Sequence, residues 1–540
     1  MIARFLALAK LVPECSGDDS LGSNSLPLRF SVDCSPGSTA GRSIVIESAD
    51  HVKVSTPRAV RVAQWAQAGI LFGLYLTPIL WCFRTAGFAD PDVWWHMRSG
   101  QWVLQHHVVP HTDPFSSFGA GRPWSAYNWL FDIIIFKLYD QFGLAGLVIY
   151  SVVMILLFVV LLHRLIRHRQ QDFTIGVLLT LIACYCLTSL DSPRSWWISI
   201  NFFVLELDIL MRARTSGKSR GLVWLPLIFA LWVNLHMEFV FGFLLLFLAL
   251  AESLAARRIK LESQIRPRQW ITITVLCLLA TLVNPYGWGI YRIVLQLATQ
   301  QFPIYKVIDF QPLGFRSLSD FIVLFLALFA AAALARARRI ALFETALLAF
   351  AVVMSFRSQR DTYLVVVAAC AILALEINKT SESRFYLKTP AIVSVACAAA
   401  FAAAFALRVS HVDNARMQMI LADRLPARAV AFVKARGYPG PLFNDFAWGG
   451  YLMWDLRMPV AIDGRAPLYD DSYLDNSLAT WSGSPGWSSD PDLARAGLVI
   501  GPAGSALTQL LRMDPRFKLV FEDKVAAVFV AVRNVSADSH

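Results

Sequence analysis

Two aspartates separated by one proline, Asp90 and Asp92, are followed directly by Val93, two tryptophans and His96. Pro91 favours extended backbone at Asp90, and side chains two residues apart in an extended chain point the same way. Two facing carboxylates can hold a divalent cation such as Mg²⁺ or Mn²⁺, or act as an acid and a base. They can also bind a cationic or polyhydroxylated ligand. The alternative is a solvated loop with tryptophans at the depth of lipid headgroups.

The chain that carries this motif has the composition of a membrane protein. Of its 540 residues, 56% are hydrophobic and 16% are charged, with a mean hydropathy of +0.52, whereas a soluble domain is nearer half apolar and a quarter charged. Apolar runs of roughly 17–25 residues, the length that crosses a bilayer, recur along it. We therefore predict a mainly α, polytopic helical membrane protein with about eleven spans. These spans lie near 62–83, 143–162, 173–190, 196–211, 221–235, 237–255, 269–283, 319–335, 340–356, 362–377 and 389–408.

Lys and Arg residues lie mostly in short loops. In that position they indicate how the protein is oriented in the membrane and do not indicate nucleic-acid binding. Loops at one end of the predicted spans carry 18 Lys and Arg in 46 residues, and those at the other end carry 10 in 109. Because basic loops stay in the cytoplasm, the N-terminus is expected inside. Asp90 and Asp92 are then outside, in a large first outer loop spanning 84–142.

Three regions follow from this pattern. Residues 1–57 are rich in Ser, Gly, Asp and Pro and are expected to form a disordered cytoplasmic extension. The membrane domain covers 58–408, and 409–540 are expected to form an extracytoplasmic α/β domain. In that tail the sequence predicts a helix over 425–437 and strands at 441–444, 451–454, 460–462, 497–500, 518–521 and 525–532. The eight cysteines have neither zinc spacing nor a disulfide pattern and are expected to act as small hydrophobes.

Polar residues collect in the predicted outer turns. His236 and Glu238 lie in one tight turn, and Arg357 and Arg360 lie in another. Any one of them could cap a helix or extend towards the headgroups. Their common side, shared with the acidic motif, indicates one outer cleft, since ionisable groups at membrane depth usually face a cavity or a substrate path.

The architecture resembles the GT-C superfamily of membrane glycosyltransferases, which place an acidic motif after the first span and use polyprenyl-phosphate-linked sugars. More narrowly, it is similar to a group of bacterial multi-pass membrane proteins. The shared segments stand here as Asp90–His96, Pro110–Ser116, Asn234–His236, Asn284–Gly287, Phe443–Leu452 and Ile462–Arg465. One departure matters. Many members have His-Glu-Trp where this chain reads Tyr127, Asn128 and Trp129, so an acid or base role at Asn128 does not carry over.

The resemblance implies transfer of a sugar from a polyprenyl-phosphate donor to an envelope glycan, lipid or protein. The site would lie on the outer face of the bacterial cytoplasmic membrane, next to the bilayer. Arg357 and Arg360 would hold the phosphate, because guanidinium groups match phosphate oxygens. Asp90 or Asp92 would deprotonate the acceptor hydroxyl, or the pair would hold a metal. His96, His236 and Glu238 would complete the substrate-binding cleft.

In the tail, Asp445, Trp448 and Asp463 are candidates for binding the acceptor, since aromatic rings beside acids suit sugars. An alternative assigns these residues to turns and to the core. Two other functional classes stay open at this point. One is a transporter of lipid-linked glycans, and the other is a non-catalytic assembly or sensing protein with the same architecture.

Overall fold

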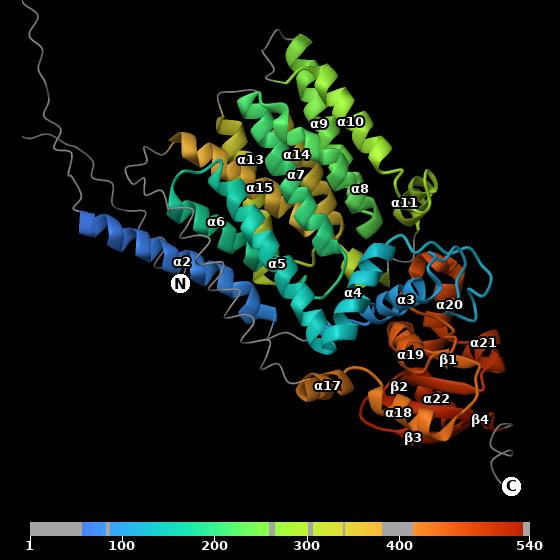
Figure 1. Ribbon diagram of the computed structural model, residues 1–540. Coiled ribbons are helices and arrows are strands. Elements are labelled where there is room, and N and C mark those ends of the chain that lie inside the picture. The colour runs from blue at the N-terminus through green and yellow to red at the C-terminus, as the bar shows by residue number, and fades with distance from the viewer. Residues whose placement is uncertain are drawn as a thin grey trace, which may run out of the picture. The chain divides into compact units, whose positions relative to one another are not determined.

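The computed structural model describes residues 57–82, 87–258, 265–300, 306–337, 341–380 and 414–532. The predicted extension 1–57 therefore lies almost wholly outside the described residues, as does the predicted span 389–408. Within them the chain is mainly helical and has a small sheet in its C-terminal part (Figure 1).

The membrane domain is a series of helices joined by short turns (Figure 1). It comprises α2 (Pro57–Cys82), α3 (Val93–His106), α4 (Trp129–Phe142), α5 (Leu144–Arg167), α6 (Phe173–Cys186), α7 (Trp196–Ser216), α8 (Leu225–Leu235), α9 (Phe239–Arg258), α10 (Pro267–Ala280), α11 (Gly289–Thr299), α13 (Leu318–Arg336), α14 (Leu342–Arg357) and α15 (Thr362–Thr380).

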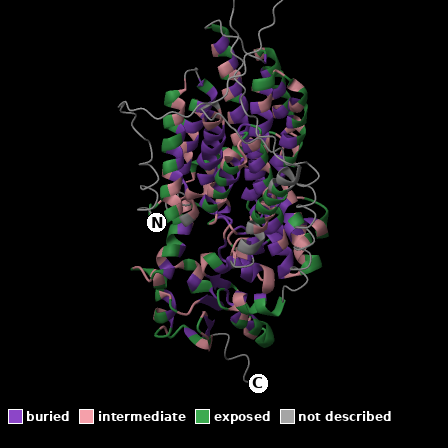
Figure 2. Ribbon diagram, turned by 90° about the vertical axis from the view of Figure 1, so that its left-hand side faces the viewer, coloured by how far each residue is buried: buried purple, intermediate pink, exposed green. Residues whose placement is uncertain are grey.

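By length and composition, four described helices could cross a membrane, and three shorter apolar helices accompany them. The four are Leu144–Arg167, Phe239–Arg258, Leu318–Arg336 and Gln359–Asn378. Large apolar side chains are exposed on their outer faces, as at Leu157, Phe247 and Phe329, while buried residues line the inner faces (Figure 2). Such exposure suits a lipid environment. The predicted count of eleven spans stays a prediction.

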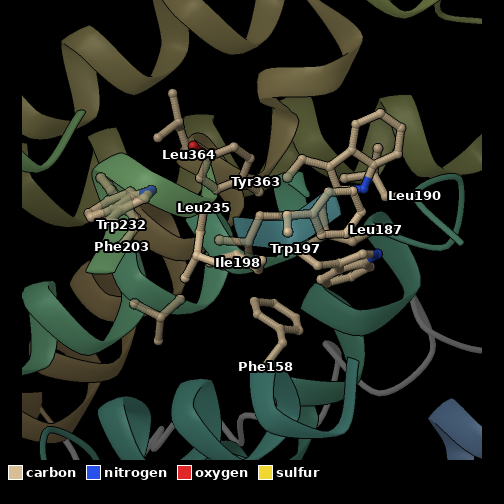
Figure 3. Close-up of a cluster of buried hydrophobic side chains, with 14 of the residues drawn as sticks. Phe158, Leu187, Leu190, Trp197, Ile198, Phe203, Trp232, Leu235, Tyr363 and Leu364 are labelled. Carbon is tan, nitrogen blue, oxygen red and sulfur yellow. The ribbon is translucent and has the colours of Figure 1, made fainter. Parts of the chain in front are cut away.

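Aromatic and aliphatic side chains fix the helices that later carry the site residues (Figure 3). Trp197 of α7 packs on Phe158 of α5, with ring centroids 5.8 Å apart. Phe203 of α7 packs edge-on against Tyr363 of α15 at 5.9 Å. These contacts hold the turns at the ends of α7 and α15 in place.

In the first loop, 84–142, the helices α3 and α4 pack tightly against each other. A Cβ at Gly100 of α3 would lie 2.0 Å from the backbone oxygen of Asp132 in α4, so only glycine allows this approach. The first loop thus contains two helices, and glycine at their crossing sets their separation.

The C-terminal domain is a four-stranded sheet with helices around it. Its strands, β1 (Leu442–Asn444), β2 (Leu498–Pro502), β3 (Phe517–Glu522) and β4 (Ala526–Ala531), lie in the order β1-β2-β4-β3. β1 and β2 are parallel, and the other pairs are antiparallel. The helices are α17 (Asn414–Ala422), α18 (Ala427–Arg436), α19 (Gly449–Asp455), α20 (Asp471–Trp481), α21 (Pro491–Arg495) and α22 (Ala506–Leu511).

Strands β1 and β4 are buried on both faces, since all their residues are buried and successive side chains on a strand point to opposite faces. Val528 and Val530 of β4 join the large core shared with the membrane helices, whereas Phe529 joins a second core within the domain. The apolar run in β4 therefore serves two cores. This arrangement makes the C-terminal domain continuous with the helical part.

Two predictions for this domain are wrong. Residues 451–454 belong to α19 and not to a strand, because Gly450 brings this helix against the backbone of Pro91 and Trp95. Residues 460–462 form no strand of the sheet. Val460 instead makes an isolated parallel bridge to Ser116 of the first loop.

A buried ion-pair cluster joins the first loop to the C-terminal domain. Arg465 contacts Asp113 at 2.5 Å and Asp463 at 2.8 Å, and all three side chains are almost fully buried. The Tyr469 hydroxyl donates to Asp463 at 2.8 Å, and Trp124 packs on the guanidinium at 4.6 Å. The sequence motif containing Asp463 and Arg465 thus holds two distant segments together.

Replacing Gly242 of α9 with alanine should destabilise the helical core. The new Cβ would lie 2.6 Å from Oε2 of Glu206 and 2.7 Å from Phe229, and overpacking costs about 1–3 kcal/mol. Thermal unfolding of the purified protein measures this. The matched control is Gly73→Ala in α2, where a Cβ meets nothing within 4 Å. Equal unfolding temperatures for the two variants would contradict the packing described.

Replacing Arg465 with methionine should loosen the C-terminal domain, because it leaves Asp113 and Asp463 buried without a cation. Removing one partner of a buried ion pair costs about 3–5 kcal/mol. Arg495→Met is the control, since the Arg495 side chain is 73% exposed and surface pairs contribute about 0–1 kcal/mol. Limited proteolysis between the two regions would report the loss, and unchanged resistance would refute this role for Arg465.

Candidate functional site

The two carboxylates of the acidic motif converge on one guanidinium. Arg194, in the loop before α7, contacts Asp90 through Nε at 2.8 Å and Asp92 through a terminal nitrogen at 2.6 Å. Asp309 approaches the same group at 3.9 Å. The two acids therefore converge on one cation, although Pro91 and Asp92 form a turn and not the extended chain that the sequence predicts.

Asp90 and Asp92 differ in how fully they are engaged. One oxygen of Asp90 accepts the backbone N–H of Asp92 at 2.9 Å, and the other accepts from Arg194. Asp92 keeps a freer oxygen, since its Oδ2 bonds Arg194 while its Oδ1 abuts Gly464 of the C-terminal domain. Burial raises the pKa of Asp92, and Arg194 opposes that rise. Asp92 is thus the better placed of the two to meet a ligand.

The predicted metal site does not match this geometry. The space between the two carboxylates is taken by Arg194, and Nδ1 of His96 contacts Asp132. Across the described residues, no three His, Cys, Asp or Glu side chains are grouped to hold a metal ion. Asp90 and Asp92 therefore do not fit a Mg²⁺ or Mn²⁺ site in this arrangement.

A second group of predicted residues gathers around Arg360. Its guanidinium donates to Glu238 at 2.8 Å and to Nε2 of His236 at 3.0 Å. Burial and the nearby cation lower the pKa of His236 well below its usual value, so the ring is neutral and can accept this bond. The other ring nitrogen contacts Ser199 at 2.7 Å.

One tryptophan joins the two groups. Arg194 lies over the ring of Trp196 at 4.9 Å and Arg360 lies over it at 5.6 Å. The short helix η4 (Ile308–Phe310) approaches both arginines, through Asp309 and Phe310. Asp90, Asp92, His236, Glu238 and Arg360 therefore form one continuous polar cluster. Arg357 is exposed at the end of α14, with no ion pair to this cluster among the described residues.

His96 lies behind the acidic motif, on α3. Its Nδ1 contacts the Asp132 carboxylate of α4 at 2.6 Å, and both side chains are buried. The ring of His96 stacks on that of Trp95 at 3.5 Å. Burial raises the pKa of Asp132, and His96 opposes that rise. This pair joins the two helices of the first loop next to their crossing.

A pocket of about 490 Å³ adjoins these groups. The first loop, α3, α4, α11 and the C-terminal domain all contribute to its wall. The lining residues are Trp95, His111, Pro123, Trp124, Ser125, Ala126, Tyr127, Asn128, Asp132, Pro285, Tyr286, Gly289, Arg292, Ile293, Gln296, Gly464, Arg465 and Pro467. Ligand pockets are commonly of this size, with aromatic walls and a few polar groups.

Asp92 does not line this pocket but lies next to Gly464, which does. Gly464 lines the pocket, and a Cβ at Gly464 would come within 1.9 Å of Oδ1 of Asp92. The exposed Arg292 of α11 also lines it, with no ion pair among the described residues. The polar cluster and the pocket therefore share a boundary.

The tail residues proposed for the acceptor have other surroundings. Asp463 is fully buried and is bonded to Arg465 and Tyr469. Trp448 is buried in the shared core, and Asp445 accepts the backbone N–H of Ala447 at 2.9 Å. No described contact brings Asp445 or Trp448 to the pocket, whereas the neighbouring Gly464 and Arg465 form part of its wall.

Sequence reasoning missed several residues that build the site. Asp132 had a usable signal, because it is a lone carboxylate in the apolar segment 129–136, and such groups usually have a functional partner. Arg194 lies between the predicted spans 173–190 and 196–211, but nothing in the sequence connects it with Asp90. Tyr127 and Arg292 carry no spacing signal at all.

Comparison with known proteins gives similarities to solved structures alone. No protein-family model matches the sequence, and no curated protein matches it. Among solved structures, the chain is similar to ArnT from Cupriavidus metallidurans bound to undecaprenyl phosphate. The TM-score is 0.45 at 11% sequence identity, and the match covers 88% of this chain and 98% of that chain.

Proposed function

We propose that this protein is a membrane glycosyltransferase. It moves a sugar from a polyprenyl-phosphate donor to a cell-envelope acceptor on the outer face of the cytoplasmic membrane. The observation that carries the proposal is the close approach of Asp92 to Gly464, because Gly464 lines an aromatic, polar pocket and Arg194 holds the Asp92 carboxylate beside it. The apolar helices and the sequence resemblance to GT-C enzymes support the choice of a lipid-linked donor.

The geometry suits glycosyl transfer in three respects. The aromatic side chains of Trp95, Trp124 and Tyr286 can pack on a sugar ring, as aromatic faces do on apolar C–H surfaces. Asp92 can accept the proton of an acceptor hydroxyl, and its raised pKa makes it a stronger base than an ordinary carboxylate. The nearby guanidinium groups can stabilise a phosphate.

Transfer breaks two bonds and forms two others. The acceptor O–H bond breaks and its proton passes to Asp92. The acceptor oxygen attacks the anomeric carbon, and the bond between that carbon and the phosphate oxygen breaks. Polyprenyl phosphate leaves with the bonding electron pair. Arg194, which is 20% exposed, fixes Asp92 during this step and offsets part of the negative charge.

The arginines proposed to bind the phosphate differ in the bonds that they already make within the protein. Arg360 is bonded to Glu238 and His236 through one terminal nitrogen, and its buried Nε has no partner among the described residues, so it can contribute both charge and a donor. Arg292 lines the pocket, is exposed and has no ion pair among the described residues. Arg292 therefore joins Arg360 as a proposed phosphate contact, and Arg357 is less well placed.

Asp92→Asn should abolish transfer while the protein still folds. Losing a general base costs about 10²–10⁴-fold in rate, whereas the amide keeps the shape of the side chain. The assay follows labelled sugar from polyprenyl-phosphate donors into a bacterial envelope extract, using the purified full chain in lipid. Asp140→Asn is the control, because Asp140 is 53% exposed on α4 and, among the described residues, pairs only with Lys137.

Transfer retained in both Asp90→Asn and Asp92→Asn would overturn the proposal. Donor binding without transfer by the wild-type protein would favour a non-catalytic role.

Gly464→Ala should also reduce transfer, because the added Cβ would displace the Asp92 carboxylate at 1.9 Å. Gly504→Ala is the matched control in the same domain, since a Cβ there meets nothing within 4 Å. The rate of transfer and the unfolding temperature are measured for both. A Gly464→Ala variant as active as Gly504→Ala would show that contact between the domain and Asp92 is not required.

A further inference from the structure

Asp132 is a buried carboxylate that the reaction above does not use. It lies on the first turn of α4 with 0% exposure, and it lines the pocket. Its Oδ1 contacts His96 at 2.6 Å. Its Oδ2 makes no hydrogen bond of good geometry among the described residues, although the buried Ser99 hydroxyl lies close enough to act on the carboxylate. A carboxylate oxygen has room for more than one donor, so Oδ2 can also accept from a ligand.

Two more polar atoms of the same wall share this property within the described part of the chain. Oδ1 of Asn128 and Nε1 of Trp95 are buried and have no hydrogen-bond partner, and both residues line the pocket. Asn128 precedes Asp132 by four residues, and the Asp132 N–H donates to its backbone oxygen at 2.9 Å. The two side chains therefore lie on the same side of the start of α4.

The unused atoms define a ligand class. Two are acceptors, Oδ2 of Asp132 and Oδ1 of Asn128, and one is a donor, Nε1 of Trp95. A ligand with several hydroxyl groups satisfies all three, because each hydroxyl both donates and accepts. The aromatic members of the wall suit the C–H face of such a ligand.

We infer that Asp132 and Asn128, together with Trp95, form a saccharide-binding subsite in this pocket, and that His96 holds Asp132 in position for it. Asp132 is the substrate-contacting residue, because it offers the free oxygen. His96 is a positioning residue, because its contact is with Asp132. The subsite selects sugars by their hydroxyl arrangement, and its ligand class rests on the proposed glycosyltransferase function.

This role differs from that of the acidic motif. Both carboxylates of the motif are bonded to Arg194, whereas the direct ring partner of Asp132 is the imidazole of His96. Burial raises the pKa of Asp132 and Arg465 opposes that rise, but the Arg465 guanidinium is bonded to Asp113 and Asp463. Asp132 thus keeps one oxygen for a hydroxyl, and Asp92 remains the proposed base.

The test measures sugar binding separately from transfer. The full chain in detergent is titrated with a panel of methyl pentosides and methyl hexosides, and tryptophan fluorescence reports binding because Trp95 and Trp124 line the pocket. At least one glycoside should saturate the signal. Asp132→Asn should weaken its binding about tenfold or more, since a hydrogen bond to a charged group is lost. Asp140→Asn, on the same helix, should bind as the wild type does.

A second variant separates positioning from folding. His96→Gln keeps a side chain that can donate to Asp132, so it should retain the fold and lose only part of the affinity, whereas His96→Leu should lose as much as Asp132→Asn. In the transfer assay, Asp132→Asn should raise the KM for the sugar substrate far more than it lowers kcat. Unfolding temperatures establish that the variants are folded.

Two results would overturn the inference. One is the absence of saturable binding across the panel, which would leave the three polar atoms to ordered water. The other is wild-type affinity in a folded Asp132→Asn variant. Saccharide binding that depends on Asp132 in a protein that transfers nothing would uphold the subsite and refute the proposed function. Transfer by the wild-type protein, together with an unchanged KM in Asp132→Asn, would uphold the proposed function and refute the subsite.

Discussion

The contact of Arg194 with Asp90 and Asp92 is the interaction on which the rest of the site depends. Two acids so close together repel each other unless a cation lies between them, and the guanidinium has the shape and the permanent charge to do this. The guanidinium of Arg194 also lies over the ring of Trp196, and the guanidinium of Arg360 lies over the same ring. Through these contacts the acidic motif is connected to the turns that precede α9 and α15.

The pocket exists because distant segments meet beside this contact. The first loop supplies α3 and α4, the segment after α10 supplies α11, and the C-terminal domain supplies Gly464 and Arg465. The buried Asp113–Arg465–Asp463 cluster holds the loop and the domain together. The C-terminal domain is therefore part of the wall of the site, and glycine at position 464 lets that wall approach Asp92.

Much of the fold follows from sequence pattern, because long apolar runs and alternating strands have strong periodic signals. Strands β1, β2, β3 and β4 and the helix ending before Gly437 were all predicted. The segment 451–454 was misread as a strand because its aromatic residues suit a sheet, whereas its packing on α3 is a tertiary effect. The convergence of Asp90 and Asp92 was predicted for an extended chain, whereas Pro91 and Asp92 form a turn. Their partner Arg194 lies about a hundred residues away, and no periodicity connects the two.

The measurement that tests this account most directly is a cryo-EM map of the full chain in a lipid nanodisc with a non-hydrolysable polyprenyl-phosphonate sugar. The account predicts density for the sugar in the pocket, with its ring beside Trp95 and Trp124, its hydroxyls at Asp132 and Asn128, and its anomeric carbon next to Asp92. Sugar density elsewhere on the molecule, with this pocket filled only by water, would contradict it.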